Sequence, residues 1–477
     1  MADARPDMIL ITTDQQRFDT FGRCKPSFLR TPHLDHLAQD DVTFSHAYSD
    51  CPVCVPSRVS IMSGKLARTH GCLQNYPSSR FLGHGDTLPA VLRDLGYQTA
   101  AIGKMHFGPA RCRHGFDEMI ISNDYHWEMD RNGSPLKPMQ HGIGQNELWP
   151  GMATVPEAMT FTAWTANQCV HSIRERRDPT VPFFLWCSFS KPHPPLDPPE
   201  PYYSMYRRSD IPERMRSDWS DDARCPECIK RLRQRGSEDL MPPEIIREVR
   251  AAYYGLITQI DYNMGRVFSA LQDLDLLREA LILYTSDHGE FLGDHGLTGK
   301  YWFHEASARL PFILRFPKSW KSRPYGTENE SLVTLADVLP TLAAAAGGRA
   351  PAGSDGVNLL DILEGCHYDP NQDTMDYAAI TDGRHKYIWY FEGPSEQLFD
   401  LEVDPHELHN AADDPAYASM KQALQAELVA REKARGGAHL AGGKLASRRP
   451  RGDTEHERRA DPWPGYHTEY CEKDVKH

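Results

Sequence analysis

The sequence lacks an excess of positive charge. Its 53 lysine and arginine residues are outnumbered by 66 aspartate and glutamate residues, which gives a formal net charge of −13 at pH 7. A protein that coats DNA or RNA needs a basic surface, so we expect no nucleic-acid partner. A small anionic substrate is still compatible with this balance, because a local cationic pocket can lie within an acidic protein.

Long apolar runs are also missing. No stretch approaches the roughly 18 apolar residues that a membrane-spanning helix needs. A basic segment followed by an apolar one, the pattern of a secretion signal, is absent from the short polar stretch before Met8. Internal repeats and the glycine patterns of dinucleotide and P-loop sites are absent as well. We therefore expect a cytoplasmic protein without a membrane partner.

The cysteines do not form the dense pattern of a small disulfide scaffold, since eleven of them are spread over the whole length. Two CxxC pairs, Cys51/Cys54 and Cys225/Cys228, suggest a four-cysteine zinc site. The pairs lie far apart in the chain, so we interpret Cys225 and Cys228 as reduced thiols in a polar loop. A catalytically silent zinc scaffold remains as an alternative from another class of protein.

Apolar strands alternate with helices along most of the chain, which predicts an α/β fold with a largely parallel sheet and helices on both faces. The predicted strands cover residues 8–13, 98–103, 182–189 and 280–286. The predicted helices cover residues 86–96, with Asp86 as N-cap, 157–177 and 244–276. Short antiparallel strands and a helix over residues 416–435 follow. We expect a catalytic domain over residues 1–370 and a C-terminal subdomain with an extended tail over residues 371–477.

Polar side chains follow each of the four predicted strands of the large sheet. They are Asp14 and Gln15, Lys104 and His106, Lys191 and His193, and the segment Asp287-His288-Gly289-Glu290. Any one of these clusters is explained equally well by a loop charge or a helix cap. Because ligands of parallel sheets bind beyond the carboxyl ends of the strands, we expect the four clusters to converge.

The side chains of these clusters suit a metal ion and an anionic ester. Carboxylate and amide oxygens from Asp14, Gln15 and Asp287 favour Ca²⁺ or Mg²⁺. His288 is a borderline ligand that lets Mn²⁺ compete. Several lysines and histidines would add positive charge around the metal, namely Lys104, His106, Lys191, His193 and Lys300. Sulfate or phosphate esters fit such a cavity, because negative charge must be held while a bridging oxygen leaves.

Cys54 is the candidate nucleophile. It begins the segment Cys54-Val-Pro-Ser-Arg58, which precedes a predicted helix over residues 59–64. Pro56 suits the first turn of a helix, where a missing N–H is not needed. Near Arg58 and the positive end of the helix, the pKa of the thiol would be lowered and the thiolate could attack a substrate. A buried structural thiol is the alternative.

The segment Cys54-Val-Pro-Ser-Arg58, followed by Ser63-Gly64, resembles the signature of the type I sulfatases in the alkaline phosphatase superfamily. Further segments are similar to that family at residues 103–106, 192–194, 286–300, 397–401 and 404–407. The resemblance implies a mixed, mostly parallel sheet sandwiched by helices, plus a small C-terminal subdomain with a short antiparallel sheet and a helix. It also implies that a maturation enzyme oxidises Cys54 to formylglycine, whose hydrated aldehyde is the nucleophile.

The resemblance implies a role for each site residue. The metal ligands would be Asp14, Gln15, Cys54, Asp287 and His288, around one divalent ion, with Ca²⁺ favoured over Mn²⁺ and Mg²⁺. The catalytic residues would be Cys54, Arg58, Lys104, His106, His193 and Lys300. Arg58 and Lys104 would stabilise the hydrated aldehyde, and His106 would be the base that expels sulfate from the covalent intermediate. His193 and Lys300 would bind the oxyanion and assist the leaving group.

Two positions depart from the commoner sulfatase pattern. Many sulfatases have two aspartates where this chain has Asp14-Gln15, and Asp-Asn where it has Asp287-His288. The combination here is similar to the phosphonate monoesterase and phosphodiesterase branch and to choline-sulfatase-like enzymes. We interpret the chain as a hydrolase of small sulfate monoesters (aryl, alkyl or choline), which Ser57 favours, with a phosphonate monoester or phosphodiester hydrolase as the alternative. The aromatic C-terminal tail predicts a homo-oligomer.

Overall fold

The computed structural model describes most of the chain. Described are residues 5–446, apart from residues 76–79, 83–84, 134, 221–224, 236–240, 321–323, 364–370, 374–376, 393–394, 435 and 438. The tail on which the homo-oligomer prediction rests lies outside the described residues. No helix in the described part of the chain is both long and apolar enough to cross a membrane.

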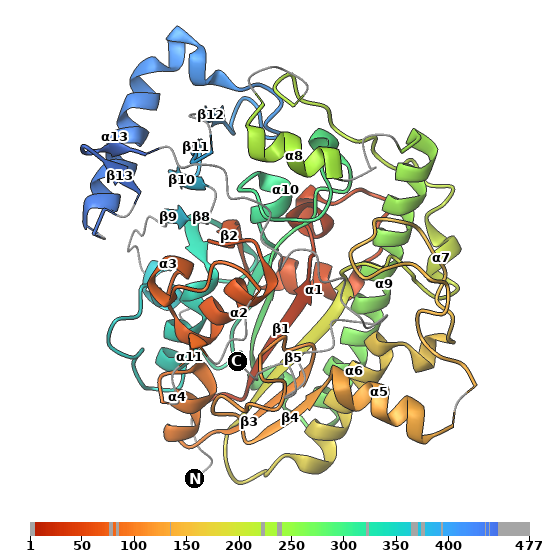
Figure 1. The fold of residues 1–477 in the computed structure, drawn as a ribbon. Coiled ribbons are helices and arrows are strands. Elements are labelled where there is room, and N and C mark those ends of the chain that lie inside the picture. Colours follow the sequence, from red (N-terminus) through yellow and green to blue (C-terminus); the bar gives the residue numbers. More distant parts are fainter. Residues whose placement is uncertain are drawn as a thin grey trace.

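An eight-stranded sheet forms the centre of the larger part of the molecule, with strand order β4-β3-β5-β1-β6-β7-β2-β8 (Figure 1). Its strands are β1 Met8–Asp14, β2 Val42–Tyr48, β3 Gln98–Gly103, β4 Glu118–Ile121, β5 Phe183–Pro192, β6 Leu281–Ser286, β7 Phe312–Arg315 and β8 Thr327–Thr334. Strand β7 runs antiparallel to both neighbours, β6 and β2. The other neighbouring pairs are parallel. The predicted mixed, mostly parallel α/β sheet is therefore confirmed.

Helices cover both faces of this sheet. Successive strand residues point to opposite faces, and both sets are apolar, so each face needs a covering layer. Met8 and Leu10 pack with helices α2 Cys54–Ser63, α4 Leu88–Asp94 and α11 Val338–Ala345. Ile9 and Ile11 point the other way and pack with α1 Pro32–Asp40, α6 Phe161–His171 and α9 Pro243–Asp273. The remaining helices are α3 Ala67–His70, α5 Ser122–Arg131, α7 Tyr202–Met205, α8 Glu227–Arg235, α10 Glu305–Ala308 and α12 Leu359–Ile362.

A small antiparallel sheet lies toward the C-terminus, as predicted, in the order β12-β11-β10-β9 (blue in Figure 1). Its strands are β9 Asn371–Asp373, β10 Tyr377–Thr381, β11 His385–Tyr390 and β12 Ser395–Asp400, and a short hairpin of β13 Leu440–Ala441 and β14 Lys444–Leu445 follows. One face of this small sheet is covered by helix α13 Ala418–Ala434, whose Leu424 and Leu428 pack against it. The other face packs against Tyr48, Trp302 and Phe303 of the larger part. The domain boundary at residue 370 stays a prediction.

The predicted elements differ from the structure mainly at their ends. Helix α4 begins at Leu88 with Thr87 as N-cap, so Asp86 as N-cap is wrong; Pro89 occupies the first turn and suits that start. The helix predicted over residues 157–177 is α-helical only from Phe161 to His171 and then continues as a π-helix to Arg176. Helix α2 begins at Cys54, earlier than the predicted residue 59.

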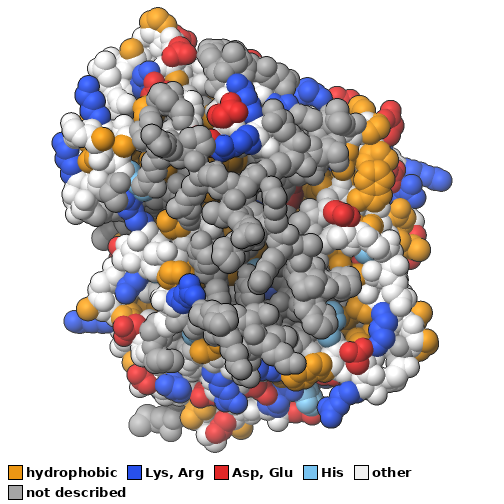
Figure 2. All heavy atoms as spheres, in the orientation of Figure 1, with side chains coloured by type: hydrophobic (Ala, Val, Ile, Leu, Met, Phe, Trp, Pro, Cys, Tyr) orange, Lys and Arg blue, Asp and Glu red, His pale blue; other side chains and the backbone are white. Residues whose placement is uncertain are grey.

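Charged side chains of both signs are interspersed on the described surface of the face shown in Figure 2. This mixture agrees with the acidic balance of the sequence. On the described part of that face, lysine and arginine side chains form no continuous stripe of the kind that a nucleic-acid backbone would require.

Candidate active site

The four predicted polar clusters meet at one edge of the large sheet. Strands β3, β5, β1 and β6 are neighbours in that order and run parallel, so their carboxyl ends lie together. Lys104, which follows β3, forms an ion pair with Asp14 at the end of β1. The backbone N–H of Gln15 donates to Asp287 Oδ1 over 3.1 Å. The convergence that the strand pattern predicted is therefore present.

Gly103 allows strand β3 to approach β5 closely just before Lys104. It has a φ of +103°, and a Cβ at this position would lie 2.0 Å from the backbone oxygen of Ser188. The Lys104 N–H donates to that same oxygen over 2.9 Å. A side chain at residue 103 would push the two strands apart and move Lys104 away from Asp14.

Four buried side chains form a group that fits a metal ion. The ligand atoms of Asp14, Cys54, Asp287 and His288 lie within 4.8 Å of one another. Asp14 Oδ1 has no hydrogen-bond partner among the described residues although it is buried. Such an orphaned carboxylate oxygen is costly unless a cation or proton completes it. The residues present therefore fit a divalent ion.

His288 has the tautomer that a metal ligand needs. Its Nδ1 lies 3.0 Å from the backbone oxygen of Gly289, which can only accept, so Nδ1 carries the hydrogen. Nε2 is therefore the ring nitrogen that faces the group, 3.2 Å from Cys54 Sγ and 3.9 Å from Asp14 Oδ1. A backbone carbonyl that fixes the remote ring nitrogen is the usual arrangement behind a metal-binding histidine.

Gln15 lies beside this group in a constrained backbone conformation. Its φ is +72°, which is uncommon for a residue with a side chain. The Asp287 contact holds its N–H, and the Tyr253 hydroxyl donates to its backbone oxygen over 2.7 Å. Its side-chain oxygen accepts from Lys300 Nζ over 2.8 Å. Gln15 is therefore placed where its oxygen could also face a metal ion.

Cys54 lies at the first position of helix α2, fully buried, with Sγ 3.2 Å from Lys300 Nζ and 3.2 Å from His288 Nε2. Burial alone would raise the pKa of the thiol, but Lys300, Lys104 and His288 outweigh it and hold the pKa well below its usual value. The helix N-terminus acts in the same direction. The surroundings thus stabilise negative charge at the end of this side chain.

Arg58, one turn along α2, joins the carboxylates of two strands. Its Nε donates to Asp287 Oδ2 over 3.1 Å, and its Nη2 lies 3.3 Å from Asp14 Oδ2. Nη1 donates to the Lys104 backbone oxygen and to Ser188 Oγ. A planar guanidinium can make all these bonds at once, which a lysine ammonium could not. Ser188 and Tyr253 are contacts that the sequence reasoning missed, because no motif marks them.

The two carboxylates behind the site differ in their affinity for protons. The pKa of Asp14 is lowered: burial and Cys54 raise it, but Lys104, His193 and Arg58 prevail. The pKa of Asp287 is raised to about 6 by burial and by the neighbouring Asp14. Asp14 is therefore ionised at neutral pH, whereas Asp287 takes up a proton more readily as the pH falls toward 6.

His106 and His193 are both neutral at physiological pH. Burial lowers the pKa of each ring, assisted by Lys104, and it brings the pKa of His193 to about 3. His193 Nδ1 donates to the Pro194 oxygen over 2.8 Å, so its Nε2 keeps a lone pair. Both rings bond to the Cys54 side chain. They can accept a proton close to the candidate nucleophile.

Lys191 is the cluster member that does not add its ammonium to the metal group. Its Nζ is bound by Asp197 and by the backbone oxygen of Pro195, and lies 3.4 Å from the His193 oxygen. These partners lie in the segment that follows β5, and they hold the ammonium there rather than at the metal group. Lys191 therefore braces the loop that carries His193.

The CxxC pairs do not build a four-cysteine site in the described part of the chain. Cys225 and Cys228 are buried, form no disulfide among the described residues and pack with Trp219 and Tyr390. Cys228 belongs to α8, so the predicted polar loop is wrong. Cys51 belongs to a different apolar cluster, with Val53 and Ala67.

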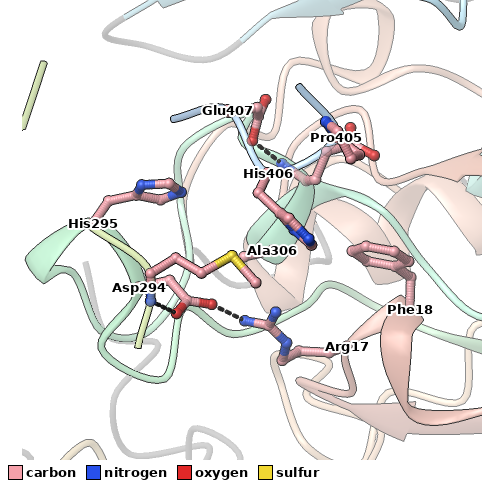
Figure 3. A pocket seen from close by; sticks show the side chains of 10 residues that line it. Arg17, Phe18, Asp294, His295, Ala306, Pro405, His406 and Glu407 are labelled. Atoms are coloured by element: carbon pink, nitrogen blue, oxygen red, sulfur yellow. Dashed lines mark hydrogen bonds and ion pairs between the residues drawn. The ribbon is translucent and has the colours of Figure 1, made fainter. Parts of the chain in front are cut away.

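A small cavity lies between Arg17 and the segment of residues 405–407 (Figure 3). Arg17 Nη1 pairs with Asp294 Oδ2 over 2.9 Å, and Arg250 binds the other oxygen of Asp294. The cavity measures about 10 Å³, room for about one water molecule. Arg17 and Arg250 together thus hold the Asp294 carboxylate beside this cavity.

Several known proteins and family models are similar to this chain. A family described as "Sulfatase" matches residues 6–348, and one described as "N-sulphoglucosamine sulphohydrolase, C-terminal" matches residues 293–434. The chain is 30% identical over 494 residues to an arylsulfatase of Clostridium perfringens, covering 95% of this chain and 100% of that protein. It is also 30% identical over 442 residues to a choline-sulfatase of Rhizobium meliloti, covering 87% and 84%.

A solved structure shows the same fold. The phosphonate monoester hydrolase of Agrobacterium radiobacter superposes with a TM-score of 0.77 at 26% identity, covering 94% of this chain and 100% of that one. The predicted resemblance and the predicted fold are thereby confirmed. Because the sulfatase match spans most of the sequence and the arylsulfatase aligns over its entire length, the chain belongs to the sulfatase family, a family of sulfuric ester hydrolases.

Proposed function

We propose that this protein hydrolyses small sulfate monoesters through a formylglycine formed from Cys54, with the help of one divalent metal ion. The observation that carries the proposal is the position of Cys54. It lies at the start of α2 with Sγ 3.2 Å from both His288 Nε2 and Lys300 Nζ, beside two buried carboxylates. A simple structural thiol would have no need of this concentration of charge.

The residues that would hold the metal are Asp14, Gln15, Asp287 and His288, with the Cys54 side chain adjacent. The unpartnered Asp14 Oδ1 and the position of His288 Nε2, which faces Cys54 and Asp14, support this set. Three oxygen donors and one nitrogen favour Ca²⁺, with Mn²⁺ and Mg²⁺ as alternatives. When bound, the ion would supply positive charge to the ester oxygens.

Cys54 would be converted by a maturation enzyme before the protein can act. The Cβ of Cys54 would become the aldehyde carbon, so Sγ in the unconverted chain lies where one oxygen of the hydrated aldehyde would be. The hydrated aldehyde would supply a nucleophilic hydroxyl at a position that already favours negative charge. Arg58 and Lys104 hold the carboxylates that flank this position.

The surrounding side chains would bind the sulfate group and move protons. Lys300 is half-buried, which marks the side of the site that reaches solvent, and its ammonium would bind a sulfate oxygen. His106 would take the proton of the remaining hydroxyl of the covalent intermediate, so that the aldehyde C=O forms again and sulfate leaves; its lowered pKa keeps the ring neutral and able to accept that proton. His193 presents a lone pair at Nε2, so it would take the proton of the attacking hydroxyl and pass it to the leaving oxygen.

A phosphonate monoester or phosphodiester hydrolase on the same scaffold is the second candidate. The similarity to the Agrobacterium enzyme favours it, as does the combination of Gln15 and His288 at the metal site. A cytoplasmic location and a homo-oligomer also stay predictions.

Initial rates on two aryl esters with the same leaving group would separate the candidates. One substrate is a sulfate monoester and the other a phosphonate monoester, with Cys54→Ala as the blank. We expect faster cleavage of the sulfate ester and no turnover in the blank. Faster phosphonate cleavage would select the second candidate, and full activity of Cys54→Ala would contradict both.

A further inference from the structure

Glu290 is a buried carboxylate close to the metal group that the proposed reaction does not use. It follows β6, is 1% exposed, and is not one of the four residues whose ligand atoms cluster. An acidic side chain seldom occupies such a place without bonded partners. Its partners therefore indicate what it does.

Both oxygens of Glu290 accept hydrogen bonds from segments that carry site residues. Oε2 accepts from the side-chain amide Nε2 of Gln15. Oε1 accepts from the backbone N–H groups of Leu292, over 3.0 Å, and Gly299, over 2.5 Å. Gly299 directly precedes Lys300, whose Nζ lies 2.8 Å from Gln15 Oε1. Gln15, Glu290, Gly299 and Lys300 thus form a closed ring of contacts beside Cys54.

This ring determines which end of the Gln15 amide faces the site. The oxygen and nitrogen ends of an amide are nearly equal in size, so shape alone does not distinguish them. A carboxylate can only accept, and therefore holds the nitrogen end. The oxygen end is left toward Lys300 and the metal group. With the amide reversed, an N–H would face two cations.

We propose that Glu290 is a positioning residue that orients the Gln15 amide, so that the pair places a neutral oxygen ligand at the metal with a carboxylate charge directly behind it. The inference rests on the proposed metal site. It assigns to Glu290 an effect on metal affinity through Gln15, rather than a contact with substrate. Partners behind metal ligands commonly have effects of this kind.

Glu290→Gln is the central test, because it keeps the shape and one accepting oxygen for Leu292 and Gly299. The new amide would donate to residue 15, so the Gln15 side chain would have to turn its oxygen away from the metal. We expect the Kd for Ca²⁺ or Mn²⁺ to rise about 10- to 100-fold. The measurement is calorimetric titration of the metal-depleted full chain, with equal formylglycine content verified by mass spectrometry.

The double variant Gln15→Glu/Glu290→Gln distinguishes orientation from bracing of the loop. The exchange keeps the total charge, and the carboxylate at position 15 has one oxygen for the new amide and one for the metal. We expect it to recover most of the lost affinity. A role limited to the backbone of residues 292–299 would not be rescued, so failure to recover would overturn the inference.

A matched control is Glu432→Gln, the same change at a buried glutamate of α13 that pairs with Arg68 away from the site. We expect its Kd to equal that of the native chain. Glu290→Asp provides a second route if Glu290→Gln does not fold, since it keeps the charge but withdraws it from Gln15, and we expect a weaker metal affinity.

The outcomes separate this inference from the function on which it rests. If the native chain binds neither Ca²⁺ nor Mn²⁺, the proposed metal site is wrong and the inference falls with it. If the native chain binds metal and the Glu290 variants bind equally tightly, the inference alone is overturned. Weaker binding in Glu290→Gln with recovery in the double variant supports it.

Discussion

Two buried groups of charged side chains in this protein differ in how completely their polar atoms are hydrogen-bonded. At the carboxyl edge of the large sheet, Asp14 Oδ1 lacks a hydrogen-bond partner among the described residues and Cys54 collects positive neighbours. Where the small sheet meets the larger part, Lys386 Nζ donates to Phe303 O, Glu305 and Glu407 over 2.6–2.8 Å. The group around Cys54 therefore has a buried oxygen without a hydrogen bond from the described residues, whereas the ammonium of Lys386 makes all three of its hydrogen bonds.

The difference shows how to separate a functional from a structural cluster. Burying a charge is expensive, and a group that serves only stability completes its own hydrogen bonds. The Lys386 group does so, and the Tyr48 hydroxyl adds a further bond to Glu305 over 3.0 Å. The group around Cys54 leaves donors and acceptors facing inward, where a metal ion and an ester can complete them.

Lys386→Met should have the largest effect, and it should fall on stability. The change leaves Glu305 and Glu407 buried next to each other without their shared cation. Breaking a buried ion pair by removing one partner costs about 3–5 kcal/mol. We expect that loss in the free energy of unfolding, measured by urea titration. The activity per folded molecule should stay near native; a small stability change would contradict the structural reading of this group.

Lys300→Met is the same substitution at the other group, and its effect should fall on activity. The lost ammonium would no longer bind the sulfate oxygens, and removal of one such donor lowers kcat by about 10²- to 10³-fold. Initial rates and urea unfolding on the same preparation check this. We expect a smaller loss of stability than for Lys386→Met. If Lys300→Met mainly lost stability and Lys386→Met mainly lost activity, the distinction between the two groups would be wrong.

Glu407→Gln should have the smallest effect, visible as a changed pH dependence. Burial and the nearby Glu305 raise the pKa of Glu407 to about 7 from an unfolded value of 4.5. The folded state therefore binds the extra proton, so this group adds stability as pH falls from about 7 to 4.5 and the gain is lost as pH rises through 7. Urea titrations at pH 8 and pH 5.5 should show a smaller difference in the variant than in the native chain.

Much of the fold could be predicted because strand and helix patterns are local. The alternation of Met8, Ile9, Leu10 and Ile11 between two apolar faces is present in the sequence itself, and β1 lies at the centre of the sheet. The exact helix starts were harder, as Asp86 shows. A cap depends on backbone contacts as well as on residue type, and Thr87 rather than Asp86 is the residue at which the chain turns into α4.

The site was predictable where its residues are consecutive and unpredictable where they are distant. Cys54 and Arg58 lie one turn apart on a single helix, so their spacing already brings them together. Arg58 also bonds to Asp14 and Asp287, which lie 44 and 229 residues away along the chain. Only folding brings those segments to Arg58. Lys191 and Lys104 look alike as residues after strand ends, yet only Lys104 pairs with Asp14.

The sequence by itself determined which segments form β1, β3, β5 and β6, that a helix lies just after the Cys54 motif, and the kinds of side chain that gather at the edge of the sheet. These depend on hydrophobic periodicity and on spacing along one element. Only the tertiary structure decided which long side chains face the metal group, which turn to their own loop, and which end of the Gln15 amide points inward. The physical reason is that each buried polar atom takes the best partner within reach, and those partners come from parts of the chain that only folding brings together.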